Sequence, residues 1–149
     1  MELCDAGDLD SQIQKRQAPP TDYFSEDEVL MLFAQICLGL KSVHDKKIMH
    51  RNLSSLHIFL KQVGNFTIAK LGSMSVARVL EHTAAIANTQ AQGMVFYIAP
   101  EVIRGSPYDR SSDIWSLGIL LYEMAALKHP FESTQAIPLI EEIKKGKYH

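Results

Sequence analysis

The longest regular hydrophobic pattern in the chain lies between residues 25 and 44. Apolar residues recur there every three or four positions, which is the spacing of one buried face of an α-helix. That face comprises Leu30, Phe33, Ile36, Cys37, Leu40 and Val43. Ser25 and Glu28 stand where a capping box would place a hydroxyl and a carboxylate on free backbone N–H groups. The pattern therefore predicts a core helix from Ser25 to about His44.

Shorter patterns predict the elements that flank this helix. Residues Leu9 to Arg16 favour a short helix, and the paired prolines that follow favour a loop because proline restricts the backbone and removes a donor. Short apolar runs at Ile48–Met49, Ile58–Leu60 and Thr67–Leu71 are separated by polar residues and glycine, which favours small strands. The middle of the chain should therefore resemble a hairpin.

The second half of the chain combines a long polar stretch with two apolar ones. Residues 73–92 have weak periodicity and many small polar side chains, which predicts a long loop. The run from Ile114 to Leu127 predicts a buried helix that is too short to cross a membrane, and the Ser-Ser-Asp sequence at 111–113 is a signal of its start. Thr134 to Lys145 predicts a final amphipathic helix, interrupted near its start by Pro138.

Composition narrows the possible functions. A chain of 149 residues with 46% hydrophobic and 21% charged residues suits one globular domain. The net charge of -2 gives no electrostatic reason to expect nucleic acid or an anionic membrane as a partner. Cys4 and Cys37 form no disulfide framework, and the start of the chain is not that of a secretion signal, so the expected location is cytoplasmic. No histidine pair has the spacing of a zinc site, so no metal is expected.

The candidate chemistry lies in the segment Ile48–Leu60, IMHRNLSSLHIFL, which is similar to the catalytic loop of protein kinases, H-R-D-L-x-x-x-N. In that pattern the Asp accepts the substrate hydroxyl proton and the Asn binds magnesium. Asn52 and His57 occupy these two positions. An amide has no basic lone pair, and an imidazole is a poor ligand for a cation that prefers oxygen. The residues predict the outline of a kinase loop without its catalytic groups.

Five further segments carry the same resemblance, in the same order and spacing as in kinases. They are MELCDAGDL, AKLGSMSVARVL, YIAPEVI, SDIWSLGILLYE and LKHPFE. Chance agreement of five motifs in register is very improbable. The chain resembles the C-terminal lobe of a eukaryotic serine/threonine protein kinase, and most of all the NIMA-related kinases. The resemblance implies a fold that is mainly α with small β-strands, a partial kinase domain over residues 1–149, and an absent N-terminal lobe.

The resemblance also assigns ligand-binding positions. Glu2 and Cys4 fall at the hinge that would bind adenine through its backbone, and Phe59 falls at the floor of the adenine site. Ser73 replaces the magnesium-binding Asp of the D-F-G motif, and Ser54 replaces the lysine that contacts the transferred phosphoryl group. The glycine-rich loop, the phosphate-binding lysine and its glutamate partner lie upstream in such kinases and are expected to be missing. No cofactor is therefore predicted, although the family would use ATP and magnesium.

Other positions match the architecture of a kinase rather than its chemistry. They are His50, Arg51, Glu101, Asp113, Trp115 and Gly118. By the resemblance, Asp113 should hold the backbone of the loop that begins at His50, and Trp115 and Gly118 should pack around it. Glu101 belongs to the A-P-E motif, where it usually pairs with an arginine of a later helix. Here it is expected to find another partner or to be solvated, because an unpaired buried carboxylate is costly.

Two functions remain open from the sequence. The first is a catalytically inactive kinase-like domain that binds proteins as a scaffold, such as an active kinase or its substrates. The alternative is an incomplete chain of a NIMA-related serine/threonine kinase that binds ATP with little or no phosphotransfer. Whether the chain is an enzyme is therefore uncertain, and a degraded gene copy without function is a third possibility. Association with the cytoskeleton is suggested only by analogy with the family.

Overall fold

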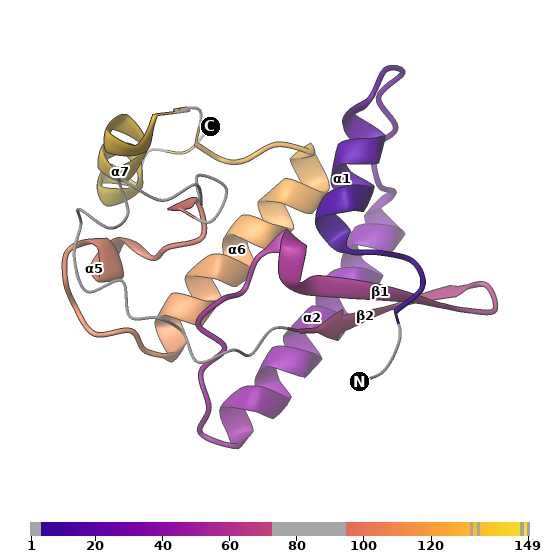
Figure 1. The fold of residues 1–149 in the computed structure, drawn as a ribbon, viewed down its shortest axis with the longest axis horizontal. Helices are drawn as coiled ribbons and strands as arrows, with labels where there is room; N and C mark the ends of the chain where they lie inside the picture. Colours follow the sequence, from indigo (N-terminus) through magenta and orange to yellow (C-terminus); the bar gives the residue numbers. More distant parts are fainter. Residues whose placement is uncertain (1–3, 73–94, 132, 134, 147, 149) are drawn as a thin grey trace.

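The computed structural model describes residues 4–72, 95–131, 133, 135–146 and 148. The elements, in chain order, are α1 (Leu9–Gln17), α2 (Glu26–Asp45), the 3-10 helix η1 (Ser55–His57), β1 (Ile58–Val63), β2 (Phe66–Leu71), α5 (Pro100–Ile103), α6 (Arg110–Ala126) and α7 (Ala136–Lys145). Helices dominate, and the two strands form one hairpin (Figure 1). This confirms the mainly helical expectation, while the long loop expected over residues 73–92 lies outside the described residues.

Helix α2 begins as the sequence predicts. The Glu28 backbone N–H donates to the Ser25 hydroxyl at 3.2 Å, and the Ser25 N–H donates to the Glu28 carboxylate at 2.8 Å. This bond to the Ser25 N–H is the main reason that the pKa of Glu28 is lowered. The capping box therefore fixes the first turn of α2.

The buried face of α2 agrees with the predicted stripe except at its first residue, since Phe33 and Cys37 of that stripe are also partly buried against the core. Its buried residues are Val29, Leu32, Ile36 and Leu40. Ile36 and Leu40 belong to the predicted stripe, but Leu30 is 54% exposed, so its assignment to the core is wrong. The helix turns a polar residue toward the hairpin: Gln35 Nε2 donates to the Thr67 carbonyl at 3.2 Å, and its Oε1 accepts from the Ala69 N–H at 2.9 Å. Gln35 therefore faces β2, while Leu30 faces solvent.

The two strands pair in antiparallel register from Ile58 opposite Leu71 to Val63 opposite Phe66. Gly64 makes the turn with φ of 56°, in the left-handed region that favours glycine. Two of the three predicted strands are thus confirmed, and both extend beyond the predicted ends. The expected strand at Ile48–Met49 is wrong, because this segment has no regular secondary structure and pairs with no strand among the described residues.

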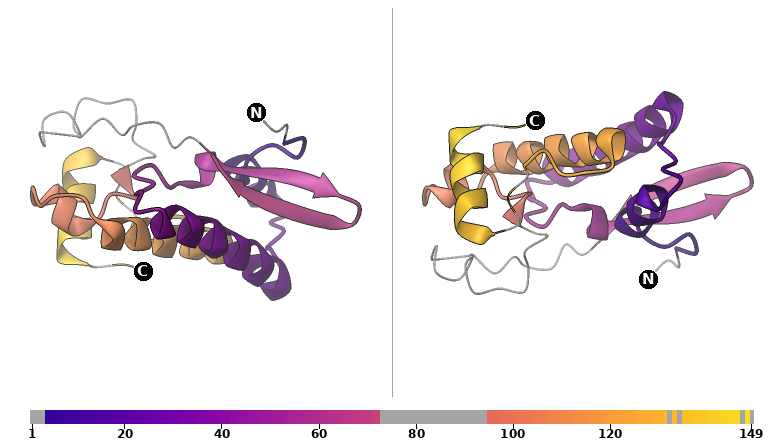
Figure 2. Two further views of the ribbon diagram at one scale, coloured as in Figure 1. Left: turned by 90° about the horizontal axis from the view of Figure 1, so that it is seen from below. Right: turned by 90° about the horizontal axis from the view of Figure 1, so that it is seen from above.

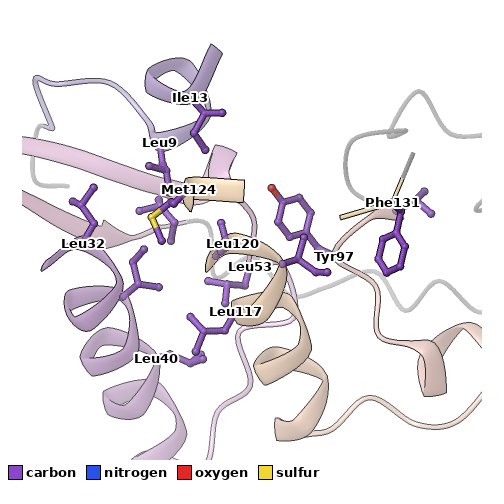
Figure 3. Packing of buried hydrophobic residues seen from close by; sticks show 14 of the residues in the cluster. Leu9, Ile13, Leu32, Leu40, Leu53, Tyr97, Leu117, Leu120, Met124 and Phe131 are labelled. Carbon is purple, nitrogen blue, oxygen red and sulfur yellow. The ribbon is translucent and has the colours of Figure 1, made fainter. Parts of the chain in front are cut away.

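Helix α6 forms the second wall of the core. Its cap is Asp109, whose carboxylate accepts from the Ser111 N–H at 2.6 Å. The helix therefore starts before the predicted Ser-Ser-Asp signal, and its C-cap, Leu127, has the left-handed conformation with φ of 53°. Figure 3 shows the core between α2, α6 and α1. It includes Leu9, Ile13, Leu32, Leu40, Leu53, Leu117, Leu120 and Met124, each at most 8% exposed.

Helices α5 and α7 lie at one end of the molecule, with the hairpin at the opposite end (Figure 2). The Arg104 guanidinium joins the two helices by donating to the Lys144 carbonyl at 2.5 Å. The expected interruption of α7 at Pro138 is wrong, because the proline lies in the first turn, where its missing N–H would have no partner within the helix. Helix α5, which contains the A-P-E glutamate, was not predicted.

Candidate functional site

The candidate catalytic loop is held by one buried carboxylate. Asp113 on α6 has no exposed surface. Its Oδ2 accepts from the His50 N–H at 3.0 Å and lies 2.7 Å from His44 Nε2. Its Oδ1 accepts from the Arg51 N–H at 2.9 Å and from the Tyr108 hydroxyl at 2.6 Å. Burial opposes the charge of Asp113, but these hydrogen bonds outweigh it and lower the pKa of the carboxyl.

His50 and Arg51 set the path of the loop. The His50 side chain is buried, and its Nε2 lies 3.1 Å from the Gly72 carbonyl while its Nδ1 faces the Asn52 N–H at 3.4 Å. Burial lowers the pKa of His50, so the ring is neutral, with Nδ1 as acceptor and Nε2 as donor. Arg51 has φ of 62°, and this left-handed backbone is held by the bond of its N–H to Asp113. The loop thus keeps a strained turn that only its partners sustain.

The substituted positions contact one another. Asn52 Nδ2 lies 3.4 Å from His57 Nε2, and Ser54 Oγ lies 2.9 Å from His57 Nδ1. With the amide as donor, Nε2 accepts and Nδ1 donates to the Ser54 hydroxyl. Both nitrogens of the imidazole are therefore directed at side chains of the same loop. Ser54 is buried, whereas Asn52 and His57 are half-buried.

The positions assigned to adenine are only partly described. Glu2 lies outside the described residues, as does Ser73 at the magnesium position, and Cys4 is half-buried. The segment that follows Cys4 pairs with β1: the Ala6 N–H donates to the Leu60 carbonyl at 3.0 Å, and the Leu60 N–H donates to the Gly7 carbonyl at 2.8 Å. Phe59 is half-buried, and its ring covers Gly72 so closely that a side chain at that glycine would collide with it.

The other residues that match the architecture of a kinase, Glu101, Trp115 and Gly118, differ in burial and in contacts. Glu101 finds another partner, since the Ser112 hydroxyl donates to its carboxylate at 2.9 Å. Trp115 is half-buried and stacks on Phe131 with the ring centroids 6.3 Å apart. Gly118 is exposed, and a side chain there would meet open space, so the expected packing at this glycine is wrong.

A second buried polar cluster joins α1, the loop, residue 97 and α6. Ser55 Oγ lies 3.3 Å from Asp10 Oδ1, 3.2 Å from Glu123 Oε1 and 3.0 Å from the Tyr97 hydroxyl. The Tyr97 hydroxyl also donates to Glu123 Oε2. Burial raises the pKa of Glu123 to about 7. One added proton on Glu123 lets it donate to Ser55 while Ser55 donates to Asp10, which satisfies both carboxyl groups.

His129 covers this cluster from the end of α6. Its ring stacks on Phe96 with the centroids 3.9 Å apart, and its Nδ1 lies 4.0 Å from Glu123 Oε1. Burial lowers the pKa of His129, so the imidazole is neutral beside the carboxyl group. The imidazole therefore adds no positive charge to the cluster.

Comparison with known proteins connects this geometry to a family. A model of the protein kinase domain matches residues 1–147. The chain belongs to the protein kinase domain family. Among its relatives, the serine/threonine-protein kinase Nek5 of Mus musculus is 46% identical over 147 residues, which is 99% of this chain and 22% of the relative. Nek1 of the same species is 41% identical over 148 residues, or 99% of this chain and 12% of the relative.

Solved structures give the same fold. The structure titled "Crystal structure of Rad53 kinase domain and SCD2 in complex with AMPPNP" matches with a TM-score of 0.78 and 27% identity, over 100% of this chain and 51% of that chain. The protein therefore has a protein-kinase-like fold and is related to Nek serine/threonine kinases. It spans about a fifth of the length of its Nek5 relative and about half of the solved chain.

Within this kinase-family domain, sequence reasoning missed two sets of residues. His44 and Tyr108 complete the shell around Asp113, and no pattern within α2 distinguishes His44 from an exposed histidine. The Ser55, Tyr97 and Glu123 cluster was also missed. A glutamate inside the apolar run 114–127 was its available signal, because a carboxyl group on a buried helix face requires hydrogen-bond partners.

The described side chains around the kinase magnesium position do not suit magnesium. His57 places an imidazole at that position, and its neighbours Asn52 and Ser54 add an amide and a hydroxyl but no carboxylate. Across the part of the chain that the structure describes, no group of three acidic, histidine or cysteine side chains is placed to hold a metal ion. Among the same residues, no helix is long and apolar enough to span a membrane.

Proposed function

We propose that this protein is a kinase-family domain that does not transfer phosphate and that acts by binding other proteins. The observation that carries the proposal is the contact between Asn52 and His57, at the two positions where kinases place the base and a magnesium ligand. The imidazole is directed at Asn52 and Ser54 through its two nitrogens, so binding a metal ion would require breaking one of these contacts.

The loss of these groups removes most of the known sources of rate. Phosphoryl transfer depends on positioning and on charge stabilisation, and a positioned base alone contributes roughly 10² to 10⁴ in rate. Asn52 cannot act as this base, and Ser73 offers no negative charge to a second magnesium position. We therefore infer no bound ATP or magnesium in the working state of this chain, and no measurable kinase activity.

We also infer that the chain corresponds to the hinge and C-terminal lobe of a kinase domain, through about the helix that follows the H-P-F motif. Its support is the shell of donors around Asp113, which orders the loop independently of catalysis. A cytoplasmic location fits the two free cysteines, Cys4 and Cys37. Cytoskeletal association stays an analogy with the NIMA-related kinases.

Exposed apolar side chains support the binding role. Large hydrophobic residues with 45% or more of their surface exposed include Leu30, Met31, Leu38, Val63, Phe66, Ile114 and Ile137. Apolar surface of this kind marks interaction sites when it is contiguous. The partners we propose are proteins, such as an active kinase or its substrates, rather than nucleic acid or membrane, because the net charge is only -2. A monodisperse monomer that binds no apolar dye would contradict this role.

A thermal-shift titration tests the nucleotide part of the proposal. The purified chain is melted with ATP alone, with magnesium alone and with both, in parallel with His57→Asn, which restores the family's magnesium ligand. We expect the melting temperature of the wild type to be independent of magnesium at every ATP concentration. A magnesium-dependent rise that is present in the wild type and lost in Asn52→Ala would contradict the proposal.

The alternative function is that of a longer kinase-family protein of which this sequence is a part. It is favoured by the fraction of each relative that the chain spans, 22% for Nek5 of Mus musculus. The intact mass of the protein recovered from its native cells separates the two cases. A mass near 16.7 kDa supports the binding module, and a heavier product directs the nucleotide titration to the longer form. The absence of any nucleotide-dependent shift in that form would remove the alternative.

A further inference from the structure

Helix α2 presents an apolar face to solvent, opposite the face that it buries. Leu30, Met31 and Leu38 are 54%, 49% and 66% exposed, and Ala34 between them is also exposed. We define the outer α2 face as Asp27, Leu30, Met31, Ala34, Leu38 and Lys41. Figure 2 shows α2 along one side of the molecule, away from α7 and α5.

The residues along this face repeat as those of a helix that packs on another helix. Asp27, Met31, Ala34, Leu38, Lys41 and Asp45 are separated alternately by four and three positions. This is the spacing of a coiled-coil seam, in which one stripe of a helix meets a second helix. The stripe is apolar in the middle and charged at both ends, as expected for a contact with a desolvated centre and a polar rim.

We propose that the outer α2 face binds the same face of a second copy of this chain, with the two helices antiparallel and the two Ala34 residues at the two-fold axis. Leu30 and Leu38 each lie four positions from Ala34, and Asp27 and Lys41 each lie seven positions from it. A two-fold axis at Ala34 therefore places Leu30 against Leu38 of the second copy and Asp27 against Lys41 of the second copy. One surface is then complementary to itself.

The charges at the two ends of the outer α2 face favour this antiparallel arrangement over other ways of pairing the two helices. A parallel pair in register would bring Asp27 against its own copy, which opposes two negative charges. An antiparallel pair centred between Ala34 and Leu38 would bring Asp27 against Asp45 of the second copy. With the axis at Ala34, each end joins a carboxylate to an ammonium group, and the small alanine lets the two backbones approach at the centre. Lys41 already pairs with Asp45 at 2.5 Å, so the incoming carboxylate would join an existing ion pair.

A single pair of helices covers less surface than a standard protein interface, so the association should be weak, with a dissociation constant on the order of micromolar. The two charged ends occur twice in the dimer by symmetry. Reversing the sign of one charge therefore alters two ion pairs, and we expect the dissociation constant to rise roughly three- to tenfold. This inference goes beyond the proposed function, because self-association does not depend on whether the chain transfers phosphate.

Sedimentation velocity of the full 149-residue chain over a wide range of concentrations tests the proposal. Asp27→Lys and Lys41→Asp should each associate more weakly than the wild type, because each opposes like charges at both ends of its own dimer. An equimolar mixture of the two variants should associate as well as the wild type, since each end then joins opposite charges. Any weakening of the fold by either substitution is also present in the mixture, so recovery isolates the interface. Lys145→Asp on α7 is the matched control and should leave association unchanged.

Two further results test whether the outer α2 face is the dimer interface. Leu38→Glu should abolish association over the same concentrations, with the thermal midpoint of the monomer retained. A wild type that stays monomeric throughout would overturn the proposal, and so would a mixture that associates no better than its separate components. Neither result bears on phosphotransfer, so that part of the proposed function is tested separately by the nucleotide titration.

Discussion

Replacement of Asp113 by asparagine, which exchanges one carboxylate oxygen for an NH2 group, should strongly destabilise the protein. The carboxylate receives two backbone N–H groups, from His50 and Arg51, and two side-chain donors, from His44 and Tyr108. An asparagine keeps the size of the side chain but turns one acceptor into a donor. In either orientation of the amide, one backbone N–H, that of His50 or that of Arg51, faces an N–H group and loses its partner. The side chain that shares this position, His44 or Tyr108, can turn to accept from the amide.

The cost follows from burial. Asp113 has no exposed surface, so a donor that loses its bond gains no water in exchange. Hydrogen bonds to a charged group contribute about 1.5–3 kcal/mol each; one is lost and the others now reach a neutral amide, so we expect the free energy of unfolding to fall by about 2–4 kcal/mol. This is a large share of the 5–15 kcal/mol of a typical domain. The lowered pKa of Asp113 means that its stabilisation is present above about pH 4 and is lost as the pH falls through the folded pKa.

Urea unfolding followed by fluorescence measures this cost, because Trp115 is the one tryptophan of the sequence and lies two residues from the substitution. The matched control is Asp109→Asn at the exposed N-cap of the same helix, where asparagine caps as well as aspartate and the expected change is under about 0.5 kcal/mol. A loss below about 1 kcal/mol for Asp113→Asn at pH 7, equal to that of the control, would refute the role of this carboxylate in holding the loop.

Three further substitutions test other parts of the structure by the same unfolding assay. Folding raises the pKa of Glu123 from 4.5 to about 7, so the stability that its protonated form contributes is lost as the pH rises through 7. Relative to Glu123→Gln, the free energy of unfolding of the wild type should fall by about 2–3 kcal/mol between pH 5 and pH 8. Parallel stability curves for the two proteins would contradict this. Lys47 is exposed with φ of 59°, so Lys47→Gly should stabilise by about 0.5–1 kcal/mol, whereas Lys46→Gly, at φ of -81°, should not. Leu120 is fully buried, so Leu120→Ala should cost about 2–5 kcal/mol, against a small effect for the exposed Ile137→Ala; similar losses at both sites would place the core elsewhere.

Local chemistry explains which elements could be predicted from the sequence. The capping box at Ser25 and the apolar runs around Ile36 and Ile119 depend on residues within one element, and the helices α2 and α6 follow from them. The hydrogen bonds of Gln35 to the backbone of β2 could not be predicted, because nothing in the helix itself indicates that contact. Val29 is buried and Leu30 is exposed, and because the two apolar residues are adjacent, the sequence alone does not indicate which of them faces the core.

In the candidate site, too, features within one motif could be predicted from the sequence, whereas contacts between distant residues could not. The substitutions at Asn52 and His57 are visible in the motif itself, and the role of Asp113 was expected from the resemblance to kinases. The contact between Asn52 and His57, and the shell that His44 and Tyr108 complete, depend on side chains that tertiary folding brings together. Spacing along the chain carries no signal for such contacts. The A-P-E glutamate shows this well, since its partner is a serine hydroxyl on α6 rather than an arginine.

We propose that this kinase-family domain keeps the loop scaffold and does not transfer phosphate. The deciding measurement is the transfer of radiolabel from ATP to a generic protein substrate, measured with magnesium and with manganese, for the purified chain and for Asn52→Ala. We predict no incorporation above the background without protein, and no difference between the two proteins. Incorporation by the wild type that Asn52→Ala abolishes would contradict the claim.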